Sequence, residues 1–140
     1  LSSELFYKTS KKYTQNKTML EIEGKGIVEL IELGKLHSQE MRKLLMGSLK
    51  PLLDSPIDCL VLGCTHYHFL IPILRELLPK HIRIIDSGLA VARHTQFILK
   101  KKALQNNSDK KGIHNFYTNG SVETMANLMG CKPTSINKTY

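Results

Sequence analysis

A short, continuous apolar run at residues 59–62 (CLVL) constrains the fold of this chain more than any other sequence feature. Asp58 precedes the run, Gly63 ends it, and no polar residue interrupts it. Such runs are typical of strands in a parallel sheet, because both faces of these strands are covered. A second strand of this kind is predicted at residues 82–85, where Asp86 ends it. The two runs together predict a buried parallel sheet.

The spacing of apolar residues and of capping residues predicts helices around these strands. They are expected at residues 2–13, 27–33, 38–53, 69–78, 89–102 and 122–129. Further strands are predicted at residues 19–23 and 114–118, a polar linker at 105–111, and a frayed polar tail after Gly130. Strands that alternate with helices imply an α/β fold with a mostly parallel sheet. Ligands bind at the carboxyl ends of such strands, so we expect chemistry at residues 63–66 or 86–88.

Composition indicates an ordinary globular protein, with 41% hydrophobic and 23% charged residues. The most apolar stretch, residues 59–78, contains His, Arg and Glu and is not expected to span a membrane. Residues 1–15 are polar and lysine-rich, unlike a signal peptide, which predicts a cytoplasmic location. Because the chain begins with Leu1 rather than Met, we expect it to be a piece of a longer reading frame.

A formal net charge of +8 raises the question of nucleic acid. The lysines form scattered groups, such as residues 11–12, 100–102 and 110–111, without the interleaved aromatic residues on which bases stack. Solvated faces account for this pattern, and nucleic acid is not expected as a partner.

The three cysteines, at positions 59, 64 and 131, do not form a paired framework and are expected to be free thiols. Cys64 follows the first strand directly, near a predicted helix start where backbone N–H groups favour a thiolate. His66 lies close enough in sequence to exchange a proton with it, and Thr65 offers a hydroxyl and an N–H to an anionic oxygen. A catalytic thiol and a buried structural cysteine both fit this position. Cys59 is interpreted as a core residue and Cys131 as incidental.

Residues 61–67 (VLGCTHY) resemble the second cysteine motif of the glutamate racemases. Residues 27–34 (IVELIELG), 84–88 (IIDSG) and 116–120 (FYTNG) resemble further segments of that family, in the same order. The resemblance covers nearly the whole chain and corresponds to the carboxy-terminal half of the family. It implies a parallel-sheet, three-layer α/β racemase fold. Residues 1–85 would form the second domain without its first strand, and residues 86–140 would return to complete the first domain.

The resemblance also implies a reaction: the interconversion of L- and D-glutamate by two cysteines, without pyridoxal phosphate or a metal. Cys64 is expected to exchange the α-proton on one face, and His66 to assist this thiol and contact the substrate. Thr65 is expected to hold the substrate and Glu32 to orient His66, although an exposed helix residue without a role explains Glu32 equally well. Residues 86–88 are interpreted as a structural turn.

The chain departs from the family pattern because the segment with the other catalytic cysteine, in the amino-terminal half, is missing. We therefore expect racemase activity from the full protein but not from these 140 residues alone. The full protein is expected to supply D-glutamate for peptidoglycan synthesis and to form a homodimer. His68 and Glu29 stand where many members have proline. Two alternatives stay open: a non-catalytic racemase-like binding module, for example for DNA gyrase, and a racemase of another amino acid.

Overall fold

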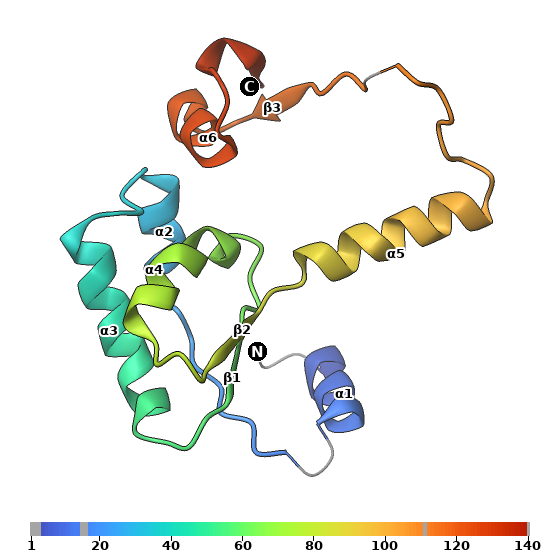
Figure 1. Ribbon diagram of the computed structural model, residues 1–140. Helices are drawn as coiled ribbons and strands as arrows, with labels where there is room; N and C mark the ends of the chain where they lie inside the picture. Colours follow the sequence, from blue (N-terminus) through green and yellow to red (C-terminus); the bar gives the residue numbers. More distant parts are fainter. Residues whose placement is uncertain (1–3, 15–16, 111, 140) are drawn as a thin grey trace.

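The computed structural model describes residues 4–14, 17–110 and 112–139, and Figure 1 shows the order of their helices and strands. The helices and strands are α1 (Glu4–Tyr13), α2 (Ile27–Glu32), α3 (Gln39–Leu53), β1 (Cys59–Val61), the 3₁₀ helix η1 (Tyr67–Leu70), α4 (Ile71–Leu77), β2 (Arg83–Ile85), α5 (Gly88–Lys101), β3 (Phe116–Thr118), α6 (Val122–Met129), the 3₁₀ helix η2 (Pro133–Ser135) and β4 (Ile136–Lys138).

The strands form two separate pairs, and both pairs are parallel. β1 pairs with β2 so that Leu60 lies opposite Ile84, and η1 and α4 form the crossover between them. β3 pairs with β4, with Tyr117 opposite Asn137, and α6 lies in that crossover. A helix between parallel strands is the unit that the sequence pattern predicts, and the predicted α/β class is confirmed.

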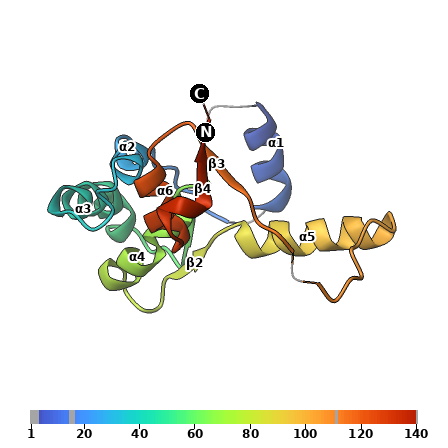
Figure 2. The same cartoon turned by 90° about the horizontal axis from the view of Figure 1, so that it is seen from above.

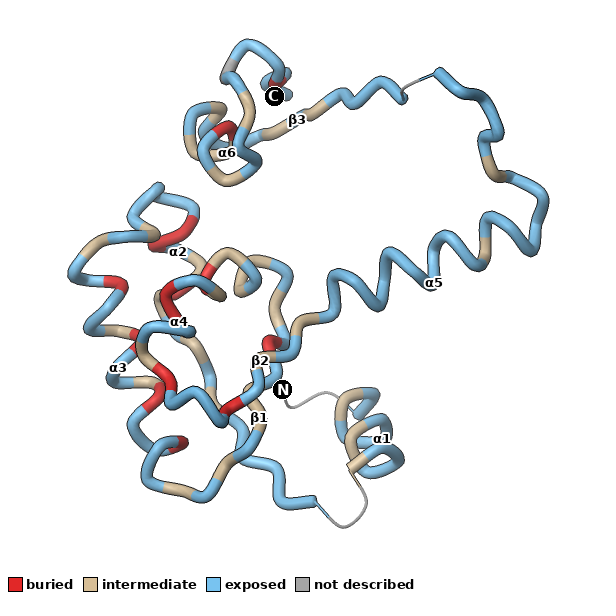
Figure 3. The backbone as a smooth tube through the Cα atoms, in the orientation of Figure 1, coloured by how far each residue is buried: buried red, intermediate tan, exposed pale blue. Residues whose placement is uncertain are grey.

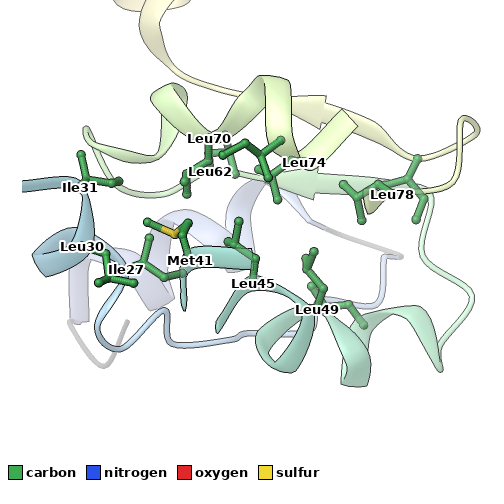
Figure 4. Close-up of a cluster of buried hydrophobic side chains, with 13 residues drawn as sticks. Ile27, Leu30, Ile31, Met41, Leu45, Leu49, Leu62, Leu70, Leu74 and Leu78 are labelled. Carbon is green, nitrogen blue, oxygen red and sulfur yellow. The ribbon is translucent and has the colours of Figure 1, made fainter. Parts of the chain in front are cut away.

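The hydrophobic core lies between α2, α3, α4 and the β1–β2 pair (Figure 4). Apolar residues recur at helical spacing on α3, so that Met41, Leu45 and Leu49 lie on one face and are almost fully buried. Residues of α4 and the loops around it complete the cluster. The thirteen buried members are Ile27, Leu30, Ile31, Met41, Leu45, Leu49, Leu52, Leu62, Leu70, Ile73, Leu74, Leu78 and Ile82.

Only one face of the β1–β2 pair is covered. Leu60 and Ile84 contact the core, whereas Val61 and Ile85, which point the other way, are 67% and 45% exposed. α2, α3 and α4 lie on one side of the strands in two perpendicular views, and α1 and α5 lie on the other side (Figures 1 and 2). The prediction of a sheet buried on both faces is therefore wrong for the described residues, because their helices cover one face alone.

Helix boundaries follow local chemistry. The Ser38 hydroxyl accepts a hydrogen bond from the Met41 N–H at 3.1 Å, which confirms the predicted cap of α3. The helix predicted at residues 69–78 begins earlier, as the 3₁₀ turn η1, and becomes α-helical only at Ile71. Pro72 at the second position of α4 is compatible with this start, because the first helical N–H groups have no partner within the helix.

Two predicted segments differ from the structure. Residues 19–23 are not a strand: Ile22 packs against the core, but the segment pairs with no strand among the described residues. The tail after Gly130 is not frayed over residues 133–138, which form η2 and β4. Ile136 is buried there, and the Thr139 N–H donates to the Thr118 carbonyl at 2.8 Å, so one apolar side chain and a ladder of backbone bonds order the tail.

α1 and α5 contain no buried residue (Figure 3). α5 projects away from the other elements in Figure 1 and exposes Leu89, Val91 and Phe97 by more than half. No helix in the part of the chain that the structure describes has the length and apolar character needed to cross a bilayer.

Candidate active site

Cys64 lies in the turn that leaves the carboxyl end of β1. The Leu62 N–H donates to the Ile85 carbonyl at 2.8 Å, which ties the strand end to β2. After Gly63 the chain turns, and the Cys64 carbonyl accepts a hydrogen bond from the Tyr67 N–H at 3.1 Å. The Cys64 side chain is half-buried in this turn. The site thus occupies the edge of the sheet where parallel folds bind ligands.

The first helix after the thiol starts nearer to Cys64 than the sequence predicts, but it starts as a 3₁₀ turn. η1 begins at Tyr67, and the seven-residue helix α4 begins only at Ile71. A helix dipole acts over its first turn, so α4 contributes little to the charge at Cys64.

The structure brings together three of the residues singled out in the sequence, Cys64, His66 and Glu32. The Cys64 Sγ lies 3.9 Å from the His66 Nδ1, a long contact between a thiol and an imidazole. The other ring nitrogen, His66 Nε2, lies 2.6 Å from the Glu32 Oε1. Glu32 is the last residue of α2 and its side chain is 56% exposed. A thiol, an imidazole and a carboxylate are thus connected in series.

This order of contacts defines how a proton can move. A carboxylate only accepts hydrogen bonds, so the short contact assigns the proton of a neutral His66 to Nε2. The Nδ1 lone pair is then free to accept the Cys64 proton, and the Glu32 charge stabilises the imidazolium that results. The arrangement can hold Cys64 as a thiolate or return its proton.

Thr65 does not take part in this series of contacts. Its side chain is exposed, and its hydroxyl makes no hydrogen bond to the residues that the structure describes. Its carbonyl accepts a hydrogen bond from the His68 Nδ1 at 2.5 Å, and His68 stacks at a tilt on Phe69 with 3.9 Å between ring centroids. The Thr65 hydroxyl is therefore accessible to a small ligand at the turn.

Sequence reasoning missed Tyr67 and Gly24. The Tyr67 hydroxyl donates to the Gly24 carbonyl at 3.3 Å, across 43 positions of sequence. Burial raises the pKa of Tyr67, and the negative charges of Cys64, Glu29 and Glu23 raise it further. The tyrosine is the last residue of the cysteine motif, but its spacing to Gly24 does not predict the contact.

The remaining candidates fall outside this group. Asp86 accepts a hydrogen bond from the Gly88 N–H at 2.8 Å, which satisfies a donor at the start of α5, as a structural turn would. Cys59 and Cys131 are half-buried free thiols.

Within the described ranges, no three His, Cys, Asp or Glu side chains lie together as metal ligands would. An open groove of about 490 Å³ lies beside α3, away from the Cys64 turn. Its lining residues are Ile22, Glu23, Lys43, Leu44, Gly47, Ser48 and Pro51.

The sequence and fold of the chain are similar to those of known glutamate racemases. The chain is 44% identical over 104 residues to the glutamate racemase of Stutzerimonas stutzeri, an alignment of 74% of this chain and 39% of the relative. Its fold is similar to glutamate racemase isoform RacE1 from Bacillus anthracis, with a TM-score of 0.77 at 22% identity over 96% of this chain and 51% of that one. Escherichia coli glutamate racemase, solved with L-glutamate and the activator UDP-MurNAc-ala, gives 0.72 at 24% identity over 97% and 53%. No family model matches the chain.

These similarities involve only part of each relative. The alignment with the Stutzerimonas stutzeri racemase spans 39% of that protein, and the structural matches span about half of each solved chain. The structural matches bear on the fold, and the predicted racemase-like α/β fold is confirmed. In sequence, the chain is also 51% identical over 79 residues to the glutamate racemase of Pseudomonas syringae, an alignment of 56% of this chain and 29% of that relative.

Proposed function

We propose that this chain, whose sequence and fold match part of the glutamate racemases, supplies one of the two proton-transfer groups of such an enzyme. The observation that supports this role is the series Cys64–His66–Glu32 at the carboxyl end of β1. Proton transfer by a positioned side chain needs a group that can hold and release one proton, and a partner that compensates its charge. The imidazole and carboxylate provide that compensation.

In the proposed reaction the Cys64 thiolate removes the α-proton of L-glutamate. The electron pair of the Cα–H bond stays on Cα and spreads into the α-carboxylate, while Cys64 becomes a neutral thiol. A second thiol on the opposite face donates its proton to Cα, which forms D-glutamate and a new thiolate. The proton count balances over the turnover, and the reverse direction exchanges the two roles. Hydrogen bonds and exclusion of water must stabilise the carbanion, because the α-proton is very weakly acidic.

The four candidate residues take different roles in this proposal. Cys64 contacts the reacting carbon, His66 assists the thiol and contacts the substrate, and Thr65 binds the substrate through its exposed hydroxyl or its N–H. Glu32 acts through His66 and is a positioning residue. The ligands named for related solved structures, D-glutamate in Francisella tularensis glutamate racemase and L-glutamate in the Escherichia coli enzyme, support glutamate as the substrate.

The second thiol belongs, in this proposal, to a part of the enzyme outside these 140 residues. Residues 1–85 contribute to one domain of the enzyme, and residues 86–140 help to complete the other. The exposed apolar residues support this division. Val61 and Ile85 on the open sheet face, and Leu89, Val91 and Phe97 on α5, are exposed apolar side chains that a larger chain would cover. The chain alone would then lack racemase activity.

The proposed metabolic role of the enzyme is based on its product. D-glutamate from a cytoplasmic racemase is consumed in peptidoglycan synthesis, and a homodimer is a further part of the proposal. A racemase-like binding module without activity remains the competing outcome of the experiment below.

The test is α-hydrogen exchange of L-glutamate in deuterated water by the complete reading frame that contains this segment, compared with its Cys64→Ala variant. We expect deuterium at Cα with inversion in the wild type. In the variant, we expect inversion to fall by at least about a thousandfold, because one of two essential proton-transfer groups is gone. Cys59→Ala is the matched control and should keep activity. A wild-type protein that neither exchanges nor inverts glutamate would leave the binding module or another substrate.

A further inference from the structure

α2 is held to the Cys64 turn at both of its ends, by two neighbouring residues of that turn. At the carboxyl end of α2, the Glu32 carboxylate accepts a hydrogen bond from the His66 ring at 2.6 Å. At the other end, the Gly24 carbonyl, which lies just before α2, accepts a hydrogen bond from the Tyr67 hydroxyl at 3.3 Å. A six-residue helix is about 9 Å long, so the two contacts are well separated.

Two separated contacts restrict rotation, whereas one contact leaves the turn free to pivot. With the Glu32 contact alone, the His66 ring could swing about that hydrogen bond and change its distance from the Cys64 Sγ, which is already a long 3.9 Å. The Tyr67 contact removes this freedom because Tyr67 directly follows His66 in the chain. The ring of Tyr67 also packs against the core.

The Gly24 side of the contact is built for close approach. A Cβ at Gly24 would lie 2.3 Å from the Tyr67 Oη, 3.0 Å from its Cζ and 2.8 Å from the Ile27 Cδ1. These separations are far below van der Waals contact, so glycine is the residue that allows the ring to lie against the backbone here. The Gly24 carbonyl also accepts the Ile27 N–H at 3.3 Å, which links the contact to the first residue of α2.

The electrostatic surroundings keep the Tyr67 hydroxyl protonated and therefore able to donate. Burial is the largest cause that raises the pKa of Tyr67, and the negative charges of Cys64, Glu29 and Glu23 raise it further.

We infer that Tyr67 is a positioning residue for proton transfer. Through its contact with Gly24 it holds the Cys64 turn, so that the distance between the Cys64 Sγ and the His66 ring is maintained. The inference rests on the proposed function for its effect on turnover, but its effect on the thiol itself does not require any substrate. Small displacements of an acid/base pair reduce rate without removing binding, so the loss should fall on kcat rather than on KM.

The experiment uses the complete reading frame with Tyr67→Phe, which keeps the ring and removes the hydroxyl, and with Gly24→Ala, which forces the ring away. Tyr117→Phe, at a tyrosine of β3 that is 60% exposed, is the matched control. The rate of alkylation of each cysteine by iodoacetamide is measured across pH by peptide mass spectrometry, with Cys59 as the internal reference. Steady-state racemisation and thermal melting are measured on the same samples.

Both variants should slow the alkylation of Cys64 at neutral pH by about threefold or more relative to Cys59, and reduce kcat by about tenfold with KM within about twofold. The melting temperature of Tyr67→Phe should stay within about 2 °C of the wild type. Unchanged Cys64 reactivity, or a kcat that falls only in step with melting temperature, would overturn the inference. If the wild type does not racemise glutamate, the proposed function fails, and the alkylation rates still decide the positioning role.

Discussion

Two regions of this chain differ sharply in how much apolar surface they bury. The helical body, defined as residues 19–87, contains all thirteen members of the main hydrophobic core. The carboxy-terminal segment, defined as residues 88–139, buries only Ala126 and Ile136 among its described residues, although α5 is one of the longest helices. Both regions contain a parallel strand pair with a helix in the crossover. Similar local structure therefore does not imply similar stability.

The difference matters for function because the residues of the Cys64 site all lie in the helical body. β1, α2 and η1 position its thiol, imidazole and carboxylate, and all three elements contact the main core. The carboxy-terminal segment also touches the helical body: Leu128 packs against the main core, and a Cβ at Gly120 would lie 3.9 Å from the Glu32 Oε2. One region carries the proposed chemistry, and the other depends on further packing to become rigid.

The largest expected effect comes from separating the two regions. The helical body, expressed alone, should unfold cooperatively in urea, because its core is contained within it. The carboxy-terminal segment alone should show no cooperative transition, since two buried side chains cannot offset the conformational entropy of its backbone. Far-UV circular dichroism during the titration measures both. A cooperative transition in the isolated segment would contradict the comparison.

A pair of core truncations tests the same contrast within the intact chain. Leu74→Ala, at a side chain that is 2% exposed in the helical body, should lower the free energy of unfolding by about 2–5 kcal/mol. Ile136→Ala, at a side chain that is 8% exposed in the carboxy-terminal segment, should cost about 1 kcal/mol or less in the main transition, because that segment opens locally. Urea unfolding gives both values, and equal losses would show that the regions unfold as one unit.

Glu32→Gln separates the chemistry of the helical body from its stability. The glutamine keeps a hydrogen-bond acceptor for His66 but removes the charge, and in the complete enzyme the racemisation rate should fall by about tenfold. The free energy of unfolding should change by less than about 1 kcal/mol, since the carboxylate is solvent-exposed. Glu40→Gln, which breaks the exposed ion pair with Lys35, is the control and should keep the wild-type rate. A normal rate in Glu32→Gln would remove Glu32 from the proposal.

The sequence predicts the elements of both regions well, because periodic apolar spacing decides local structure in each. Local chemistry indicates Cys64 and His66 as candidates, and the family resemblance adds Glu32; their side chains are in contact in the structure, and their catalytic roles are proposals. Prediction from the sequence failed where an element depends on a distant partner. Residues 19–23 alternate as a strand does but pair with no strand among the described residues, and residues 136–138 look like a polar tail but pair with β3.

Tyr67 and Gly24 were missed for a related reason. Their contact joins positions 43 residues apart. A glycine in a sequence indicates that the backbone needs room, but it does not indicate which side chain lies against it. The exposure of Val61 could not be predicted either, since an apolar strand reads the same whether or not both of its faces are covered.

Two helix caps with the same geometry offer a finer comparison. Ser38 caps α3 in the helical body and Ser121 caps α6 in the carboxy-terminal segment, each with a hydroxyl that accepts a backbone N–H at 3.1 Å. Ser38→Ala should lower the free energy of unfolding by about 1 kcal/mol. Ser121→Ala should leave the main urea transition unchanged and instead raise the amide hydrogen-exchange rates of α6. Equal effects on the main transition would mean that α6 is coupled to the core.

The smallest expected effect is a pH dependence in the helical body that Tyr67 confers. Its pKa lies above the ordinary value of 10.0, chiefly because of burial, so the folded chain holds this proton to a higher pH than the unfolded chain does. The contribution of the neutral hydroxyl to the free energy of unfolding is therefore fully present below pH 10.0, and it is lost as the pH rises through the folded-state pKa. The stability difference between wild type and Tyr67→Phe, measured by urea unfolding, should shrink over that alkaline range. A constant difference would show that the hydroxyl is not held in the environment that the Gly24 contact requires.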